Sequence, residues 1–116
     1  MNFLPCTLEG GTARVNGVSI DLAPETAASG AKAKGALELG IRPMHLEVHG
    51  VAVEGGVPVK IKTLEDQGSF KILTAGLNGH TIRARLPEGH PVPSERAWLR
   101  FPPSRTKLYA DERLVR

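Results

Sequence analysis

The chain has 116 residues, of which 41% are hydrophobic and 23% charged, and its formal net charge is +3. This composition excludes a disordered chain, and the length suits one domain with its own core. No apolar run is long enough to span a bilayer, and we expect no signal peptide from the opening residues. The single cysteine, Cys6, excludes an internal disulfide and fits a reducing compartment.

The excess positive charge lies near the C-terminus. Residues 1–93 hold equal numbers of basic and acidic groups, whereas residues 94–116 hold six basic and three acidic ones. This density is too low for the basic face that nucleic-acid-binding proteins usually present, and too low for a polybasic membrane anchor. We therefore expect no nucleic acid and no direct membrane insertion, and we interpret the basic tail as suited to a protein contact.

The first predicted elements are a hairpin and a loop. Asn16-Gly17 stands between two short segments, and an Asn-Gly pair favours the type I′ turn of a β-hairpin. Residues 23–35 contain no Leu, Ile, Val or aromatic side chain, so no apolar stripe would dock a helix there. We expect a mobile loop at about residues 23–35.

Strands dominate the rest of the chain. Residues 36–42 predict a strand that Pro43 ends, because the residue before a proline is held in extended geometry. One helical turn follows, with proline at its first position. A second pair, Asn78-Gly79, predicts another hairpin, whose alternating apolar residues favour antiparallel strands over a core. A closing ribbon is expected at residues 106–110 and 113–116.

About eight short strands and almost no helix indicate the all-β class. A closed or nearly closed barrel would remove the edges that so many short strands otherwise expose. We therefore predict a single domain over residues 1–116, an OB-like small barrel with an accessory antiparallel ribbon.

The sequence shows no motif for catalysis or metal binding. It has no P-loop and no Gly-x-Ser-x-Gly nucleophile elbow. His45 and His49 would lie too far apart on a strand to share a metal. Glu65 and Asp66 are neighbours, which point to opposite faces of a strand and do not converge on a cleft. We predict no catalytic, cofactor or metal site, and interpret Cys6 as a small packing residue.

Two binding functions remain possible for a chain without catalytic or metal-binding motifs. Backbone N–H groups in glycine-rich turns suit an oxyanion or another small ligand. OB-like barrels also bind single-stranded nucleic acid, which needs aromatic platforms for base stacking. The aromatic residues form no basic–aromatic repeat, so nucleic-acid binding is the weaker of these two alternatives.

Several segments resemble one family. Residues 39–46, Leu-Gly-Ile-Arg-Pro-Met-His-Leu, resemble the GIRPEHL signature in the C-terminal regulatory region of ATP-binding subunits of sugar-type ABC importers, with Met44 at the usual acid. Residues 63–69 resemble the strand and turn of their transport-associated OB (TOBE) repeat. Residues 83–87 and 98–101 resemble its later strands, and residues 54–58 are similar to the glycerol-3-phosphate importer subgroup.

The resemblance implies a non-catalytic regulatory and dimerisation domain. The ATPase domain, which would bind ATP and Mg²⁺, is expected to be absent from this chain. Expected partners are a twin domain in a homodimer, the chain's own ATPase domain and, indirectly, membrane permease subunits. The expected location is cytoplasmic, peripheral at the inner face of the cell membrane. The candidate interface or ligand contacts are Arg42, His45, Gly68, Ser69 and Trp98.

Overall fold

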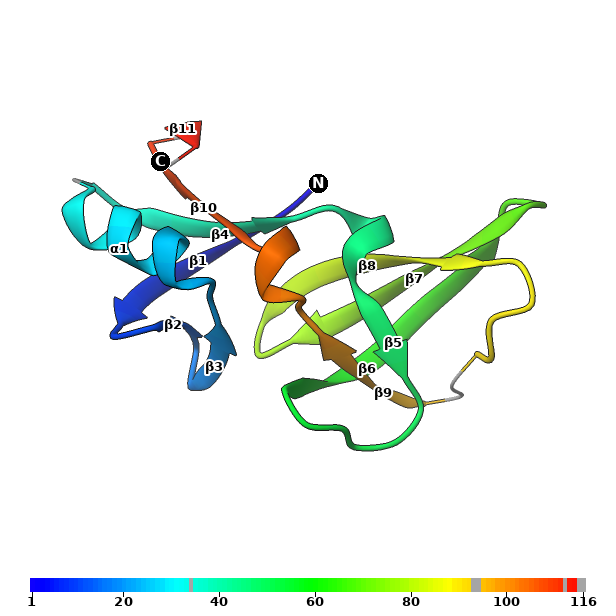
Figure 1. Cartoon of the computed structure of the whole chain (residues 1–116). Coiled ribbons are helices and arrows are strands. Elements are labelled where there is room, and N and C mark those ends of the chain that lie inside the picture. The colour runs from blue at the N-terminus through cyan, green and yellow to red at the C-terminus, as the bar shows by residue number, and fades with distance from the viewer. Residues whose placement is uncertain (34, 93–94, 112, 115–116) are drawn as a thin grey trace.

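The computed structural model of the chain describes residues 1–33, 35–92, 95–111 and 113–114. Within these residues, eleven strands, against about eight expected, form two antiparallel sheets (Figure 1). The strands are β1 (Asn2–Glu9), β2 (Thr12–Val15), β3 (Val18–Asp21), β4 (Leu37–Ile41), β5 (Glu47–His49), β6 (Gly56–Asp66), β7 (Phe70–Leu77), β8 (His80–Pro87), β9 (Arg96–Arg100), β10 (Lys107–Ala110) and β11 (Arg113–Leu114). The helices are α1 (Pro24–Lys32) and two 3₁₀ turns, η1 (Pro43–His45) and η2 (Pro103–Arg105).

The two sheets divide the molecule. The six-stranded sheet has the order β11-β10-β4-β1-β2-β3, and the five-stranded sheet has the order β5-β9-β6-β7-β8. The chain crosses to the second sheet after β4 and returns for β10, which pairs with β4. In Figure 1 the first sheet and α1 lie at one end of an elongated molecule of 41 × 25 × 23 Å, and the second sheet lies at the other end.

The all-β, OB-like class predicted from the sequence is confirmed by this architecture. Both Asn-Gly hairpins form, β2–β3 at Asn16-Gly17 and β7–β8 at Asn78-Gly79. Both asparagines have a φ of 44°, and the glycines after them have φ of 89° and 90°, as a type I′ turn requires. The accessory ribbon is β10–β11, although residues 112 and 115–116 of the predicted ribbon lie outside the described residues.

The structure corrects the mobile loop predicted at residues 23–35, because α1 occupies most of that segment. The helix packs against the sheet through small residues, since its buried positions are Ala27 and Gly30. A Cβ on Gly30 would lie 2.6 Å from Leu108 Cδ1. The missing large side chains therefore reflect a close approach of the helix to the sheet. Residue 34 lies outside the described residues. None of the described helices is long or apolar enough to cross a membrane.

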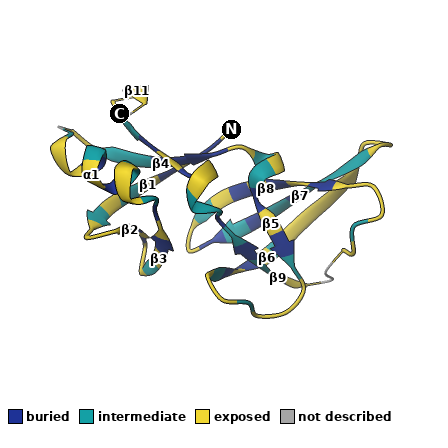
Figure 2. Ribbon diagram, viewed as in Figure 1, coloured by how far each residue is buried: buried dark blue, intermediate teal, exposed yellow. Residues whose placement is uncertain are grey.

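Both sheets turn apolar residues inward, as Figure 2 shows by the buried positions along the strands. In β8, Ile82, Ala84 and Leu86 are buried, whereas Arg83 and Arg85 between them are exposed. The predicted alternation is thus confirmed for this strand, and the polar set of the five-stranded sheet forms an outer face.

Asparagine side chains join the two sheets at two places. Asn2 is buried at the start of β1, where its Nδ2 donates to Arg83 O at 2.7 Å and its Oδ1 accepts from Arg83 N–H at 2.9 Å. The two Asn-Gly turns also meet: Asn16 Nδ2 donates to Asn78 O at 2.8 Å, and Asn78 Nδ2 donates to Asn16 O at 2.9 Å. These contacts fix one sheet against the other.

Candidate functional site

A hollow of about 880 Å³ lies on the outer face of the five-stranded sheet, over β6, β7 and β9. It forms where β6 has a free side. β6 pairs with β9 over residues 56–60 but with β7 only from Lys60 onward. Pro58 lies in the part of β6 that pairs with β9 alone. Such an edge position suits proline, which has no backbone N–H to donate to a second strand. The hollow is bounded there by the β7–β8 turn at Asn78 and Gly79.

Three basic side chains line the hollow, and we call Lys60, Lys62 and Arg96 the basic cluster. Lys60 and Arg96 stand directly opposite each other on β6 and β9. Side chains in such a pair have Cβ atoms about 4.5–5.5 Å apart, and like charges there repel. Glu95 also lines the hollow, but in the described part of the chain no ion pair neutralises any of the three.

Lys62 of the basic cluster lies at a β-bulge. The β6–β7 register shifts between Ile61 and Thr63, and such bulges redirect side chains next to functional sites. Lys62 Nζ then donates to Thr81 Oγ1 of β8 at 3.3 Å. Its stem crosses Gly76 so closely that a Cβ on Gly76 would lie 3.2 Å from Lys62 Cε.

Trp98 gives the hollow an aromatic wall. It lies half-buried on the outer face of β9, between Pro58 of β6 and His49 of β5 in the strand register. Its neighbours Ala97 and Leu99 are buried, so Trp98 and Leu99 lie on opposite faces of β9. The hollow therefore combines positive charge with an apolar surface.

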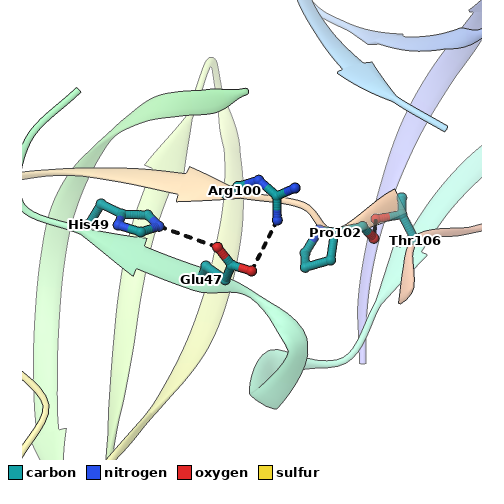
Figure 3. A network of polar contacts seen from close by, with 5 residues as sticks. All are labelled: Glu47, His49, Arg100, Pro102 and Thr106. Carbon is teal, nitrogen blue, oxygen red and sulfur yellow. Dashed lines mark hydrogen bonds and ion pairs between the residues drawn. The ribbon is translucent and has the colours of Figure 1, made fainter. Parts of the chain in front are cut away.

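The other arginine on the outer face of β9 is already paired (Figure 3). Arg100 Nη1 donates to Glu47 Oε2 at 3.0 Å, and His49 Nε2 lies 3.4 Å from Glu47 Oε1. All three side chains are at least a third exposed, so each contact contributes only about 0.2–1 kcal/mol. At the right of Figure 3, the buried Thr106 hydroxyl donates to Pro102 O at 2.9 Å. Arg100 thus differs from Arg96, for which no described acid is a partner.

A second candidate surface lies on the outer face of the six-stranded sheet. Met1 and Phe3 are 49% and 47% exposed, and the Phe3 ring meets the edge of Tyr109 with 5.1 Å between ring centroids. Gly40 lies beneath them, where a Cβ would collide with the Tyr109 ring. We call Met1, Phe3 and Tyr109 the apolar patch.

The five contact residues predicted from the sequence lie in three separate parts of the fold. Arg42 and His45 belong to the connection between the sheets, where Arg42 O accepts the His45 N–H at 3.0 Å. Gly68 and Ser69 are exposed in the β6–β7 turn, where Gly68 has a φ of 96° that favours glycine. Trp98 lines the hollow, and the other four do not. The structure therefore supports a turn role for Gly68 and does not gather the five into one site.

Sequence reasoning does not select the basic cluster. The only local signal is the alternation Val59-Lys60-Ile61-Lys62, which gives β6 a basic outer face. Pairing of Lys60 with Arg96 depends on the register of β6 and β9, which joins residues more than thirty positions apart.

Cys6 is half-buried on β1, and the pKa of its thiol is raised to about 11. Burial is the main cause, the Glu38 carboxylate adds to it, and a hydrogen bond with the Leu39 backbone opposes both. The thiol therefore stays protonated at neutral pH, where only the thiolate is nucleophilic. In the described ranges, no group of three or more His, Cys, Asp or Glu side chains is placed to hold a metal ion.

Comparisons with known proteins agree with the resemblance found in the sequence. The family model of the MalK OB fold domain matches residues 1–46. The sn-glycerol-3-phosphate import ATP-binding protein UgpC of Pectobacterium atrosepticum is 35% identical over 75 residues, which are 64% of this chain and 21% of that protein. The chain thus spans about a fifth of the length of this relative.

A solved structure shares the fold. The cytoplasmic molybdate-binding protein ModG, in a form with molybdate bound, superposes with a TM-score of 0.69 over 94% of this chain and 95% of its own. The two sequences are 15% identical, so this likeness concerns the fold alone.

The fold and the matches together define the class of this protein. It has an all-β, OB-type fold whose first 46 residues match the MalK OB fold domain, and part of the chain is similar to an import ATP-binding protein. Within that class, it is similar to the ATP-binding protein of a glycerol-3-phosphate importer.

Proposed function

We propose that the chain is a non-catalytic C-terminal regulatory and dimerisation domain of an importer ATP-binding subunit, serving carbohydrate or glycerol-3-phosphate uptake. The match of residues 1–46 to the MalK OB fold domain carries the proposal. The similarity to UgpC supports the importer class.

The proposal assigns the chain its partners and its place in the cell. It pairs with a twin domain, is joined to an ATPase domain that binds ATP and Mg²⁺, and reaches the membrane permease subunits only through that domain. The assembly is cytoplasmic and peripheral at the inner face of the cell membrane. Hydrolysis of ATP by the purified 116-residue chain would contradict the non-catalytic part of the proposal.

The apolar patch is the candidate contact for the twin domain. A two-fold interface uses the same surface on both copies, so it needs a self-complementary area. Met1 and Phe3 are exposed, and apolar side chains grouped in this way favour burial against a second surface. The paired rings of Phe3 and Tyr109 give that area a fixed shape.

The first prediction concerns self-association. The chain is expected to form dimers at micromolar concentration in sedimentation velocity, and Phe3→Asp is expected to shift it to monomer, because a charge would have to be buried. Val51→Asp is the matched control, since Val51 is 68% exposed and lies outside the apolar patch. Monomers of both the original chain and the control at every concentration would contradict dimerisation through this domain.

A second candidate function is binding of a small anion. One observation favours it, the basic cluster without acidic partners among the described residues.

A further inference from the structure

We propose that the hollow on the outer face of the five-stranded sheet binds a small phosphorylated molecule. The basic cluster contacts its phosphate group, and Trp98 lies against the organic part. This inference gives a site and a ligand class to the second candidate function and rests on it, and it does not depend on self-association.

The arrangement of charge carries the first step. Lys60 and Arg96 are directly opposite on paired strands, where like charges lower stability. Arg100, four residues further along β9, is neutralised by Glu47 at 3.0 Å. A bound dianion would relieve the repulsion between Lys60 and Arg96, and two cations side by side are placed to share one phosphate group.

The contacts of Lys62 carry the second step. Lys62 lies at the bulge in β6 and lines the hollow together with Lys60. Thr81 Oγ1 holds the Lys62 ammonium at 3.3 Å, and Gly76 leaves room for the lysine stem. A third basic side chain therefore lines the hollow, with its stem over Gly76 and its ammonium bonded to Thr81.

The size and lining of the hollow indicate more than a bare ion. About 880 Å³ falls within the range of roughly 300–1,000 Å³ that is typical of small-molecule sites. Trp98 and Pro58 line it beside the cations, and an indole ring offers both an apolar surface and one N–H donor. A ligand with a phosphate at one end and a small organic body fits this combination.

The lining favours a small molecule over nucleic acid. Single-stranded nucleic acid is held by several aromatic platforms on which successive bases stack. The hollow offers one aromatic side chain, Trp98. Free phosphate, a phospholipid headgroup and a phosphorylated metabolite share the anionic group, so the experiment must separate them.

Trp98 allows a direct test, because it is the single tryptophan of the chain. The full chain is titrated with glycerol phosphate, a hexose phosphate, inorganic phosphate, phosphatidylglycerol vesicles and an oligonucleotide, and tryptophan fluorescence is recorded. We expect a saturable change with at least one of the two phosphate esters, at lower concentration than with inorganic phosphate. Isothermal titration calorimetry checks the affinity without relying on the indole.

Variants locate the binding. Lys60→Gln and Arg96→Gln are each expected to weaken binding about tenfold or more, since each removes a charge-assisted hydrogen bond. Lys107→Gln, on β10 of the other sheet, changes the net charge equally and should leave binding unchanged. Without ligand, Lys60→Gln should melt at the same or a higher temperature than the original chain, because it relieves repulsion in a fold that stays intact.

Each remaining outcome would overturn the proposal. No response to either phosphate ester in fluorescence and calorimetry excludes the ligand class, and equal affinity for inorganic phosphate excludes the role of Trp98. Binding to vesicles only or to the oligonucleotide only assigns the basic cluster to another partner. Equal weakening by Lys107→Gln reduces the effect to net charge. Because sedimentation measures self-association separately, failure of one proposal is distinguishable from failure of the other.

Discussion

The Cys6 thiol shows how a single residue is set by its surroundings. Burial on β1 and the nearby Glu38 carboxylate both disfavour the thiolate, and together they outweigh the Leu39 backbone hydrogen bond. The side chain therefore acts as a small packing group with its proton retained.

The raised pKa of Cys6 predicts how stability depends on pH. The unfolded thiol loses its proton at its ordinary pKa of 9.0, whereas the folded thiol keeps it until about 11. The folded state therefore binds more protons between these values, and the free energy of unfolding falls as the pH rises through that window. Urea denaturation at a series of pH values measures the slope.

Cys6→Ala is the control for this pH dependence. Lysine and tyrosine titration affects both proteins, so the difference between them isolates the thiol. The variant should lose less stability than the original chain between pH 9.0 and about 11. Identical slopes would show that the thiol pKa is the same in both states.

At the scale of elements, glycines and a bulge decide how strands and their side chains fit together. In β6, pairing with β7 begins only at Lys60, and the register of that pairing shifts at Lys62. In β4, Gly40 leaves room for the Tyr109 ring of the neighbouring strand. These departures from regular strands create both candidate surfaces.

Gly40→Ala tests the close approach in β4. The added methyl group would displace the Tyr109 ring and weaken its edge contact with Phe3, so we expect a loss of about 1–3 kcal/mol in the free energy of unfolding. Gly11→Ala is the matched control, since nothing lies within 4 Å of the position of its Cβ. Chemical denaturation measures the free energy of unfolding of both variants. An equal loss of stability in the two would contradict the packing argument.

At the scale of the whole molecule, asparagine side chains lock the two sheets together. The Asn2 side chain forms hydrogen bonds with both the backbone N–H and the backbone C=O of Arg83, as a neighbouring strand would. In the two type I′ turns, each asparagine side chain donates to the backbone C=O of the other. The chain itself crosses between the sheets twice, at η1 and at η2. The relative position of the sheets therefore rests on a few polar contacts as well as on the core.

A double-mutant cycle at the two turns tests this contact. Asn16→Gly and Asn78→Gly keep the positive φ of each turn and remove the side-chain donor, so each should cost about 0.5–1.5 kcal/mol. The double variant should cost less than the sum, with a coupling of about 0.5 kcal/mol or more, because the first loss already separates the turns. Denaturation of all four proteins gives the coupling, and strictly additive costs would show that the turns act independently.

The sequence by itself determined the features that depend on neighbouring residues. The Asn-Gly pairs specified both hairpins, alternation specified the buried and exposed faces of β8, and Pro43 specified the end of β4. The residues around Gly40 and Arg42 also carried the family resemblance, which the comparisons support.

Only the tertiary structure decided features that join distant residues. Helix α1 forms because β1 and β10 together offer a surface for Ala27 and Gly30, which no local apolar stripe announces. Counting charge along the chain assigns the positive excess to residues 94–116, yet Arg96 meets Lys60 through strand register. The acids that balance the charge count of residues 1–93 form no ion pair with Lys60 or Lys62 among the described residues, because charges interact by distance and not by position in the chain.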